Sequence, residues 1–315
     1  MIDNLIRNIH DKTKNDYSID FLSYAPISSK TYKVISKDNQ KFIVKKVKDK
    51  VKNKYQFLKN EGIDNIIYPI FNNNNQFLTR LSNNIYCDDC YYVSPFYEDN
   101  NVLNEKKAKD LLNELKILHS KTSFYRKLSV IKSRNKINEI ISYLEYKFNL
   151  IEAYIREIEA QKFDEFSIPI LKNYHYILKA KNILIEKNKK IINAIKEEKS
   201  VIYCFIHNNP KIDHLIINNG NKYLISIDNG VLGIPSLDIA KYYIENEEIY
   251  FDIGKSIEEY FENYDDDFYY DYFIFLVILF YIYGIIINKK DYITTQSFIY
   301  NTNSLKKFYK TFKLQ

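Results

Sequence analysis

One stretch of the chain, residues 203–243, constrains the fold more than any other. It starts at the end of an apolar β-rich run and continues through a polar loop that His207 opens. A second β-rich run follows and ends at Asp228, before an amphipathic helical pattern begins. This order of strand, loop, strand, acidic turn and helix predicts a mixed α and β structure with His207 and Asp228 at candidate functional positions.

The first hundred residues have the character of strands with one helix. Residues 31–36 and 41–47 are β-rich runs separated by four polar residues, as in a hairpin. A helical stretch over residues 50–60 ends at Gly62, a residue type favoured just after a helix. Three further strands are expected at residues 66–71, 76–81 and 90–96, the first two joined by a turn at 72–75.

The rest of the chain, from Asn104 onward, has mainly helical patterns. Apolar residues fall on one helical face at Ala108, Leu111, Leu112, Leu115 and Leu118. Long amphipathic helices are expected over 137–161 and 171–198, and further helices from Leu237 onward. We therefore expect an N-terminal β lobe with one helix over residues 1–97 and a helical lobe over 98–315. The hinge falls at residues 94–99, where Pro95 lacks a backbone N–H.

Composition narrows the class of protein. The chain has 315 residues, 46% of them hydrophobic and 27% charged, as in folded globular proteins. The formal charge of +6 is mild and no dense Lys/Arg block occurs, so we expect no nucleic-acid partner. Three cysteines argue against a disulfide framework, and the N-terminal residues show no signal peptide. These features predict a cytoplasmic protein.

Two apolar or aromatic tracts and one cysteine pair allow alternatives. Residues 272–287 form an apolar run shorter than the ~20 residues that cross a bilayer, so we predict a buried helix without a transmembrane segment. Peripheral membrane contact through this run stays the alternative. The tyrosine-rich tract 260–273 is expected to be core, with an adhesive surface as the alternative. Cys87 and Cys90 have the spacing of half a zinc site but too few further ligands.

The segment described first resembles the catalytic segment of the aminoglycoside phosphotransferase and choline kinase group. Members carry H-G-D-x-x-x-x-N, then an Asp in a short strand and a further Asp about ten residues later. This sequence keeps His207, Asp228 and Asp238, but has Asn209 at the position of the catalytic Asp and His214 at that of the Asn. The resemblance implies an α+β, two-lobed protein-kinase-like fold with a small, mainly antiparallel β N-lobe and a larger helical C-lobe. ATP and Mg²⁺ would be its cofactors if it is active.

Within that group, the chain resembles the CotS-type spore coat proteins of endospore-forming bacteria over about residues 25–290. The matching elements are Val44-Lys45-Lys46, Gly62-Ile63-Asp64-Asn65, Tyr91-Tyr92-Val93, the Leu115–His119 element, Phe124-Tyr125-Arg126, the paired long helices and the His207/Asp228/Asp238 segment. This resemblance implies a place in the spore coat, with other coat proteins as partners.

The resemblance assigns Lys45 to the strand lysine that holds the nucleotide phosphates, with Lys46 as the competing candidate because neighbours on a strand face opposite ways. The partner expected for this lysine, a Glu on the next helix, is missing, since residues 50–60 contain no carboxylate. No glycine precedes Gly62, so a glycine-rich phosphate loop is missing as well.

The catalytic loop departs from the pattern at two positions. An amide at Asn209 cannot accept a proton, and losing a general base typically costs ~10²–10⁴ in rate. His214 would offer a nitrogen where Mg²⁺ prefers oxygen, with Asp213 as an alternative oxygen ligand. Asp228 matches the metal-binding Asp, although an acidic residue in this position also forms simple turns. We expect structural tasks for His207, which would hold the loop, and for Asp238, which would cap a helix at Ile239.

These observations lead to one interpretation and two rivals. The first is a kinase-like, spore coat-associated structural or interaction protein, a pseudokinase without the catalytic Asp. The second is an active small-molecule phosphotransferase that uses ATP and Mg²⁺, with Lys45 on phosphate and Asn209 only positioning the acceptor. The third is attachment to a membrane surface through residues 272–287.

Overall fold

A computed structural model describes residues 12–81, 88–128, 130–161, 164–288 and 291–314. The chain forms two compact units, one made of residues 1–122 and 205–232, the other of residues 123–204 and 233–315. We call them the sheet unit and the helical unit. Each unit is a compact group of residues that contact one another. The lobe boundary expected between residues 97 and 98 is a different division of the chain and stays a prediction.

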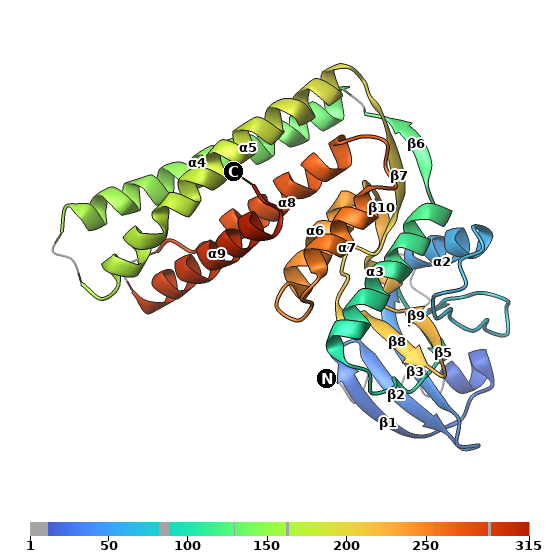
Figure 1. Cartoon of the computed structure of the whole chain (residues 1–315). Helices are drawn as coiled ribbons and strands as arrows, with labels where there is room; N and C mark the ends of the chain where they lie inside the picture. The colour runs from blue at the N-terminus through green and yellow to red at the C-terminus, as the bar shows by residue number, and fades with distance from the viewer. Residues whose placement is uncertain (1–11, 82–87, 129, 162–163, 289–290, 315) are drawn as a thin grey trace. The chain divides into compact units, whose positions relative to one another are not determined.

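The sheet unit is built on five antiparallel strands in the order β1-β2-β3-β5-β4 (Figure 1). Their bounds are β1 Phe21–Ser28, β2 Thr31–Ser36, β3 Lys41–Lys48, β4 Thr79–Arg80 and β5 Asp89–Pro95. Val44 of β3 lies opposite Val93 of β5, and both are buried with Tyr32, Val34 and Tyr91 in one core. Burial alternates along β2, as expected for a strand with one face on the core.

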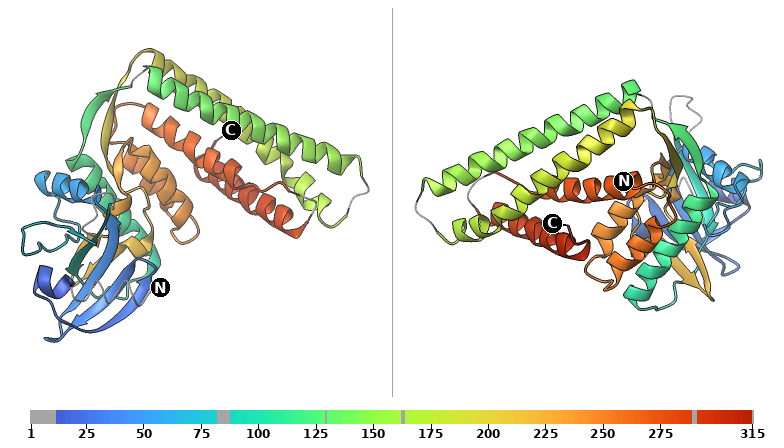
Figure 2. Two further views of the ribbon diagram at one scale, coloured as in Figure 1. Left: turned by 180° about the vertical axis from the view of Figure 1, so that it is seen from behind. Right: turned by 45° about the horizontal axis from the view of Figure 1, so that its top comes forward.

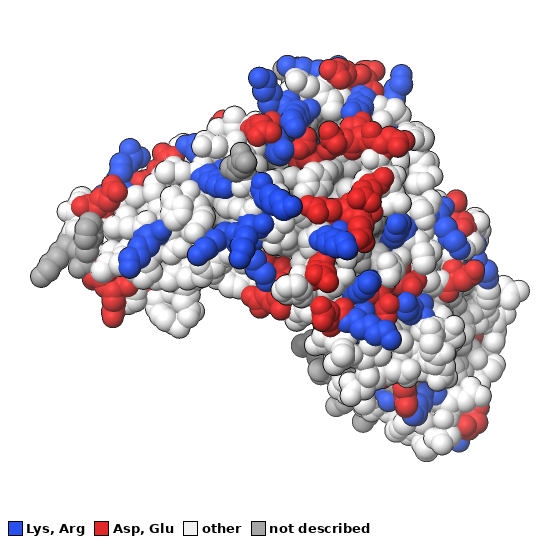
Figure 3. Space-filling model, viewed as in Figure 1, with Lys and Arg blue, Asp and Glu red and all other residues white. Residues whose placement is uncertain are grey.

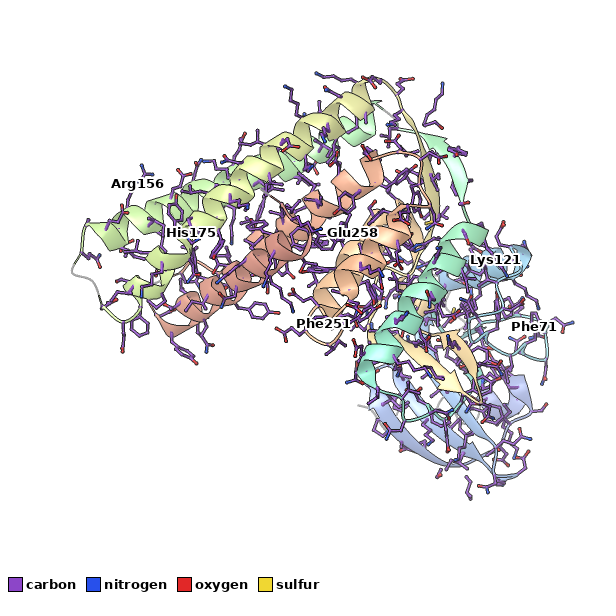
Figure 4. All side chains as sticks on the ribbon, in the orientation of Figure 1. Phe71, Lys121, Arg156, His175, Phe251 and Glu258 are labelled. Atoms are coloured by element: carbon purple, nitrogen blue, oxygen red, sulfur yellow. The ribbon has the colours of Figure 1, made fainter. Side chains whose placement is uncertain are left out.

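The expected hairpin and the helix after it are confirmed. Strands β2 and β3 pair antiparallel, and helix α2 (Val51–Asn60) follows. Gly62 then adopts a φ of +66°, the left-handed conformation that ends many helices. Lys121, the last residue of helix α3 (Asn104–Lys121) and labelled in Figure 4, donates a hydrogen bond to the Gly62 carbonyl oxygen (3.1 Å).

The segment after α2 differs from expectation. Residues 66–71 are not a strand, because Pro69 lacks an N–H and the segment makes only separate hydrogen bonds, from Ile67 to Leu224 and from Ile70 to Val93. The strand expected over 76–81 shrinks to Thr79–Arg80. Phe71, labelled in Figure 4, stacks on the Phe77 ring at 4.5 Å instead. The turn at 72–75 is confirmed, since the Asn72 side chain accepts hydrogen bonds from the backbone N–H groups of Asn74 and Gln76.

Helix α3 (Asn104–Lys121) and a second hairpin complete the sheet unit. The apolar face expected for α3 is confirmed, since all five of its residues are at most 5% exposed. The hairpin consists of β8 (Leu215–Asn218) and β9 (Asn221–Leu224). Asn219 and Gly220 both have positive φ between the strands, as a two-residue hairpin turn requires. Short 3₁₀ turns lie on either side of the hairpin, at Ile212–His214 and Ile227–Asn229.

The helical unit contains the long helices α4 (Val130–Glu159) and α5 (Ser167–Lys196), which lie side by side in Figures 1 and 2. Both long helices are therefore confirmed, and both begin earlier than expected. Strand β6 (Phe124–Lys127) pairs with β7 (Ser200–Ile206), and β10 (Val231–Gly233) is the last strand. The remaining helices are α6 Ser236–Asn246, α7 Ile253–Phe261, α8 Phe268–Gly284 and α9 Tyr292–Thr311.

Helix α8 is the core of the helical unit, as the apolar run predicted. Most of its residues are buried, and Phe273 and Val277 are 0% exposed. Most aromatic rings of the tyrosine-rich tract 260–273 are buried, as expected for core, and Tyr264, Tyr270 and Tyr272 are half-buried, so the alternative of an adhesive surface stays untested. Among the described residues, no helix has the length and apolar character needed to span a bilayer.

Charged side chains of both signs are interspersed on the face shown in Figure 3. The expectation that no nucleic acid binds stays a prediction.

Candidate functional site

A cavity of about 700 Å³ lies within the sheet unit and collects most of the candidate site residues. Its walls come from the β1–β2 turn, β3, the 94–97 segment, the loop after β7 and the turn after β9. Lys45, Asn209, Asp213, His214 and Asp228 all line it. Its volume lies within the 300–1,000 Å³ range of small-molecule sites. The fold therefore brings into one cavity candidate residues that lie far apart in the sequence, such as Lys45 and Asp228, which are 183 positions apart.

Lys45 and Asp228 form an ion pair in this cavity. The Lys45 Nζ lies 2.7 Å from the Asp228 Oδ1, and the two side chains are only 16% and 19% exposed. A hydrogen bond to a charged group that is this well shielded contributes roughly 1.5–3 kcal/mol. The strand lysine thus pairs with the carboxylate at the metal-binding position, in place of the helix glutamate that this chain lacks.

The two neighbouring lysines of β3 have different surroundings. Lys46 pairs with Asp89 of β5 (2.7 Å), which also accepts from Lys48 (2.8 Å). Lys46 does not line the 700 Å³ cavity, whereas Lys45 does. Of the two candidates, Lys45 is the one placed with Asp228.

Helix α2 contributes a cation where the resemblance leads one to expect an anion. Lys54 of α2 donates to the Asp228 backbone carbonyl oxygen (2.6 Å). Burial lowers the pKa of the Lys54 ammonium, the nearby Lys50 lowers it further, and the Asp228 charge opposes both. Lys54 was missed in the sequence, although the lack of any carboxylate between residues 50 and 60 was a signal that this helix had changed its partner.

The loop after β7 is held by its two histidines. His207 is fully buried, its Nε2–H donates to the Ile225 carbonyl oxygen (2.7 Å), and its Nδ1 accepts from the Asn209 N–H (3.3 Å). The His214 Nδ1–H donates to the Asn209 carbonyl oxygen (2.7 Å). Both ends of the Asn209 peptide unit are thereby fixed. Among the described residues, no side chain or backbone group is hydrogen-bonded to the Asn209 side-chain amide, which is half-buried.

Burial also affects the ionisation of side chains that line this cavity. Burial lowers the pKa of His214, and the hydrogen bond to Asn209 only partly offsets this effect. The pKa values of Tyr55 and Tyr92 are raised, mainly by burial and further by the charge of Asp228, so both phenols stay protonated. Two protonated phenols and an imidazole with a lowered pKa therefore line the cavity beside the shielded ion pair of Lys45 and Asp228.

Asp238 lies in the helical unit, in the first turn of α6, and is fully buried. The expectation that it caps a helix at Ile239 was wrong in register, because α6 begins at Ser236 and Asp238 is already helical. A structural task for Asp238 stays a prediction. Of the cysteine pair, Cys90 is buried in β5, and Cys87 lies outside the described residues.

The cavity does not fit Mg²⁺ well enough to assign a metal site. The Asp228 carboxylate already accepts from Lys45, and His214 offers a nitrogen to an ion that prefers oxygen ligands. Asp213 lines the cavity but is exposed. Within the described part of the chain, no three His, Cys, Asp or Glu side chains are grouped so that they could hold a metal. The metal roles of Asp228 and His214 stay predictions.

The hinge segment also lines the cavity, but two of its residues offer no free backbone N–H to a ligand. Pro95 has no N–H, and the Phe96 N–H donates to the Lys41 carbonyl oxygen (3.1 Å). An adenine ring at this edge would find neither of these two backbone donors.

Comparison with known proteins identifies the fold. No model of a protein family matches the chain, and no curated protein matches it in sequence. Its structure is similar to an aminoglycoside phosphotransferase from Alicyclobacillus acidocaldarius, with 11% identity, a TM-score of 0.60 and coverage of 93% of this chain and 92% of that one.

Two further solved structures agree. A spectinomycin phosphotransferase in complex with ADP and spectinomycin has 15% identity and a TM-score of 0.54, with coverage of 96% of this chain and 98% of that one. A microcompartment-associated aminopropanol kinase has 9% identity and the same TM-score, with coverage of 98% of each chain. At these identities the likeness concerns the fold alone. The chain has an α+β, two-lobed protein-kinase-like fold of the aminoglycoside phosphotransferase type.

Proposed function

We propose that this chain is a pseudokinase, a kinase-like protein that accommodates a nucleotide but has lost efficient phosphoryl transfer. The observation that carries the proposal is Asn209, an amide that lines the cavity at the position of the catalytic Asp. Both backbone groups of Asn209 are held by histidine side chains, so the loop is formed although the carboxylate is missing. An amide neither accepts the proton of an incoming hydroxyl nor carries a charge to orient it.

The ion pair between Lys45 and Asp228 supports the same proposal. In active phosphotransferases of this fold group, as the resemblance implies, the lysine is steadied by a helix glutamate and the later Asp binds the metal. Here Lys45 and Asp228 bind each other, and α2 offers Lys54 instead of a glutamate. Two departures from the catalytic arrangement thus lie beside the missing carboxylate.

The biological setting we propose is the spore coat, where the chain would act as a structural or interaction component with other coat proteins. The support is the resemblance in sequence to CotS-type proteins, from Val44-Lys45-Lys46 to the His207/Asp228/Asp238 segment. The protein would be made in the cytoplasm and deposited on the forming spore. Expression confined to sporulating cells is the expected result, and expression independent of sporulation would contradict this part of the proposal.

The rival is an active small-molecule phosphotransferase. It is favoured by the 700 Å³ cavity, which keeps Lys45 and Asp228 together, and by the names of the structural neighbours, which are kinases of aminoglycosides and of aminopropanol. Because phosphoryl transfer depends largely on positioning, an amide lowers activity without removing every contribution.

A turnover assay separates the two. The purified chain is incubated with ATP, Mg²⁺ and small amino alcohols, and ADP formation is compared between the wild type and Asn209→Asp. Asn219→Asp, an equal charge change in the exposed β8–β9 turn, is the control. We expect the wild type and the control to match the protein-free blank, and any gain to occur in Asn209→Asp alone. ADP formation by the wild type, unchanged in Asn209→Asp, would support the rival.

A further inference from the structure

A second cavity, of about 380 Å³, shares Lys30, Lys45 and Asp228 with the larger one. We call it the lysine chamber. It is lined by Lys30, Lys45, Lys46, Lys48, Lys50, Asp89 and Asp228, together with Val47 and Val51. Five lysines against two aspartates leave an excess of positive charge in a small concave space within the sheet unit. Such a space raises the local concentration of anions.

The two aspartates of the chamber are already neutralised. Asp89 accepts from Lys46 and Lys48, and Asp228 accepts from Lys45. Lys30 and Lys50 have no carboxylate partner among the described residues. The excess charge therefore resides on two lysines, one on the β1–β2 turn and one immediately before α2.

The start of helix α2 adds backbone donors to the same place. The helix begins at Val51, which lines the chamber, and has neither a side-chain cap nor an acidic residue in its first turn. The first N–H groups of a helix lack intrahelical partners and carry partial positive charge, and in α2 the Lys52 N–H already donates to the Asp49 carbonyl oxygen (3.0 Å). Together with the lysines, they form a setting that suits an oxyanion.

The position of Lys30 links the chamber to the larger cavity. Lys30 lies in the turn between β1 and β2, and its carbonyl oxygen accepts from the Lys46 N–H (2.8 Å), which holds the turn against β3. Ser28 at the end of β1 and Ser29 in the turn line the larger cavity with Lys30. A lysine is therefore held where the two cavities meet.

We propose that the lysine chamber holds the phosphate groups of a nucleoside di- or triphosphate whose base and ribose occupy the larger cavity, and that this binding needs no Mg²⁺. The inference rests on the proposed function in one respect, that the ligand is a nucleotide. Lys30 and Lys50 supply the positive charge that a metal ion would otherwise bring, while Lys45 neutralises Asp228. The poor fit of the cavity to Mg²⁺ then has a direct explanation, because the chain has replaced metal by ammonium groups.

Calorimetric titration with ATP in EDTA tests this directly, since it needs no variant. The titration is repeated with excess Mg²⁺, with adenosine and with inorganic tripolyphosphate. We expect ATP to bind in EDTA at least as tightly as with Mg²⁺, and to bind more tightly than either fragment. Affinity in EDTA should fall as salt is added, because the contacts are between charges.

Three variants locate the phosphates. Lys30→Ala and Lys50→Ala should each weaken ATP binding in EDTA about fivefold, the effect of removing about 1 kcal/mol from an exposed charge contact. Lys50→Ala should leave adenosine binding unchanged, because Lys50 lines the chamber and not the larger cavity. Lys52→Ala is the matched control, because Lys52 lies on α2 next to Val51, is exposed and does not line the chamber. Far-ultraviolet circular dichroism checks that each variant is folded.

Each other outcome overturns the inference. Binding that requires Mg²⁺ would show that a metal, not the lysines, neutralises the phosphates. Tripolyphosphate binding as tightly as ATP would show that the chamber takes polyphosphate without a nucleoside. Equal weakening of ATP binding in Lys52→Ala would show that the phosphates do not bind in the chamber. Turnover of ATP by the wild type bears on the proposed function alone, so the two failures are distinguishable.

Discussion

At the scale of single residues, Lys45 and Lys46 show how one position along a strand changes a side chain's role. Lys45 is the one of the two that lines the 700 Å³ cavity, where it binds Asp228, which has no other side-chain cation partner within the described residues. Lys46 binds Asp89, which keeps Lys48 as a second partner. Loss of Lys45 therefore leaves a shielded carboxylate without its ammonium, whereas loss of Lys46 does not.

This difference predicts unequal effects on stability. Lys45→Met should lower the free energy of unfolding by about 1–3 kcal/mol, because a shielded charge loses its hydrogen-bonded partner. Lys46→Met, the matched control, should cost less than about 1 kcal/mol. Urea unfolding of the two variants measures both values. Equal losses would contradict the ion pair in the cavity.

His214 predicts a pH dependence. Its folded-state pKa is lowered, mainly by burial, whereas in the unfolded chain it is about 6.5. As pH falls below 6.5, the unfolded state takes up a proton before the folded state does, so stability decreases until the folded pKa is passed. Replacing His214 by Asn should remove this decrease.

The measurement is the free energy of unfolding between about pH 7.5 and pH 5, on either side of the unperturbed histidine pKa. His175→Asn serves as the control, since His175 is an exposed histidine on α5. If His214→Asn and the wild type lose stability in parallel over this range, the shielded neutral imidazole is not the cause.

At the scale of elements, sequence patterns predicted those whose buried positions recur regularly. Burial alternates along β2, whose expected bounds agree with the structure, and the apolar face expected for α3 is buried. Strand β1 was missed because only Phe21 is buried in it and Pro26 interrupts it, so it has neither alternation nor a clean run. The strand at residues 66–71 failed because Pro69 and long-range hydrogen bonds outweighed local β propensity.

The site shows the same division between local pattern and tertiary contact. The spacing of His207, Asn209, His214 and Asp228 was visible in the sequence, and the structure brings all but the buried His207 to line one cavity. Lys30, Lys50 and Lys54 could not be distinguished from other lysines, because their placement depends on the β1–β2 turn and the start of α2. In a lysine-rich sequence, a lysine that lines a cavity has the same local pattern as the many lysines that face solvent.

A prediction at the scale of elements concerns the burial of helix α8. The Phe273 ring centroid lies 5.3 Å from both Phe261 and Phe312 and 5.9 Å from Phe308. Phe273→Ala should lower the free energy of unfolding by about 3–5 kcal/mol, through lost burial and the cavity left behind. Tyr292→Ala, at a 62% exposed position on α9, should stay within about 0.5 kcal/mol of the wild type in the same denaturant titration. Similar losses in both would contradict the assignment of α8 as core.

At the scale of the whole molecule, the fold is one shared with phosphotransferases, whereas the residues that line the cavity differ from those expected for phosphoryl transfer. The fold is of the aminoglycoside phosphotransferase type, and the two phosphotransferase structures compared are 15% and 11% identical to this chain. Within the sheet unit, the cavity, the loop and the strand lysine are present, while Asn209 replaces the carboxylate and Lys54 the expected helix anion. We therefore propose that nucleotide binding persists where phosphoryl transfer has been lost.

Phosphorus NMR of ATP mixed with the purified chain tests this claim most directly, because one sample reports binding and turnover together. The account predicts that the ATP phosphate resonances broaden or shift in EDTA, and that no ADP or product phosphate resonance grows after Mg²⁺ is added. Growth of those product signals would contradict the loss of transfer, and ATP resonances unchanged by the protein would contradict the binding.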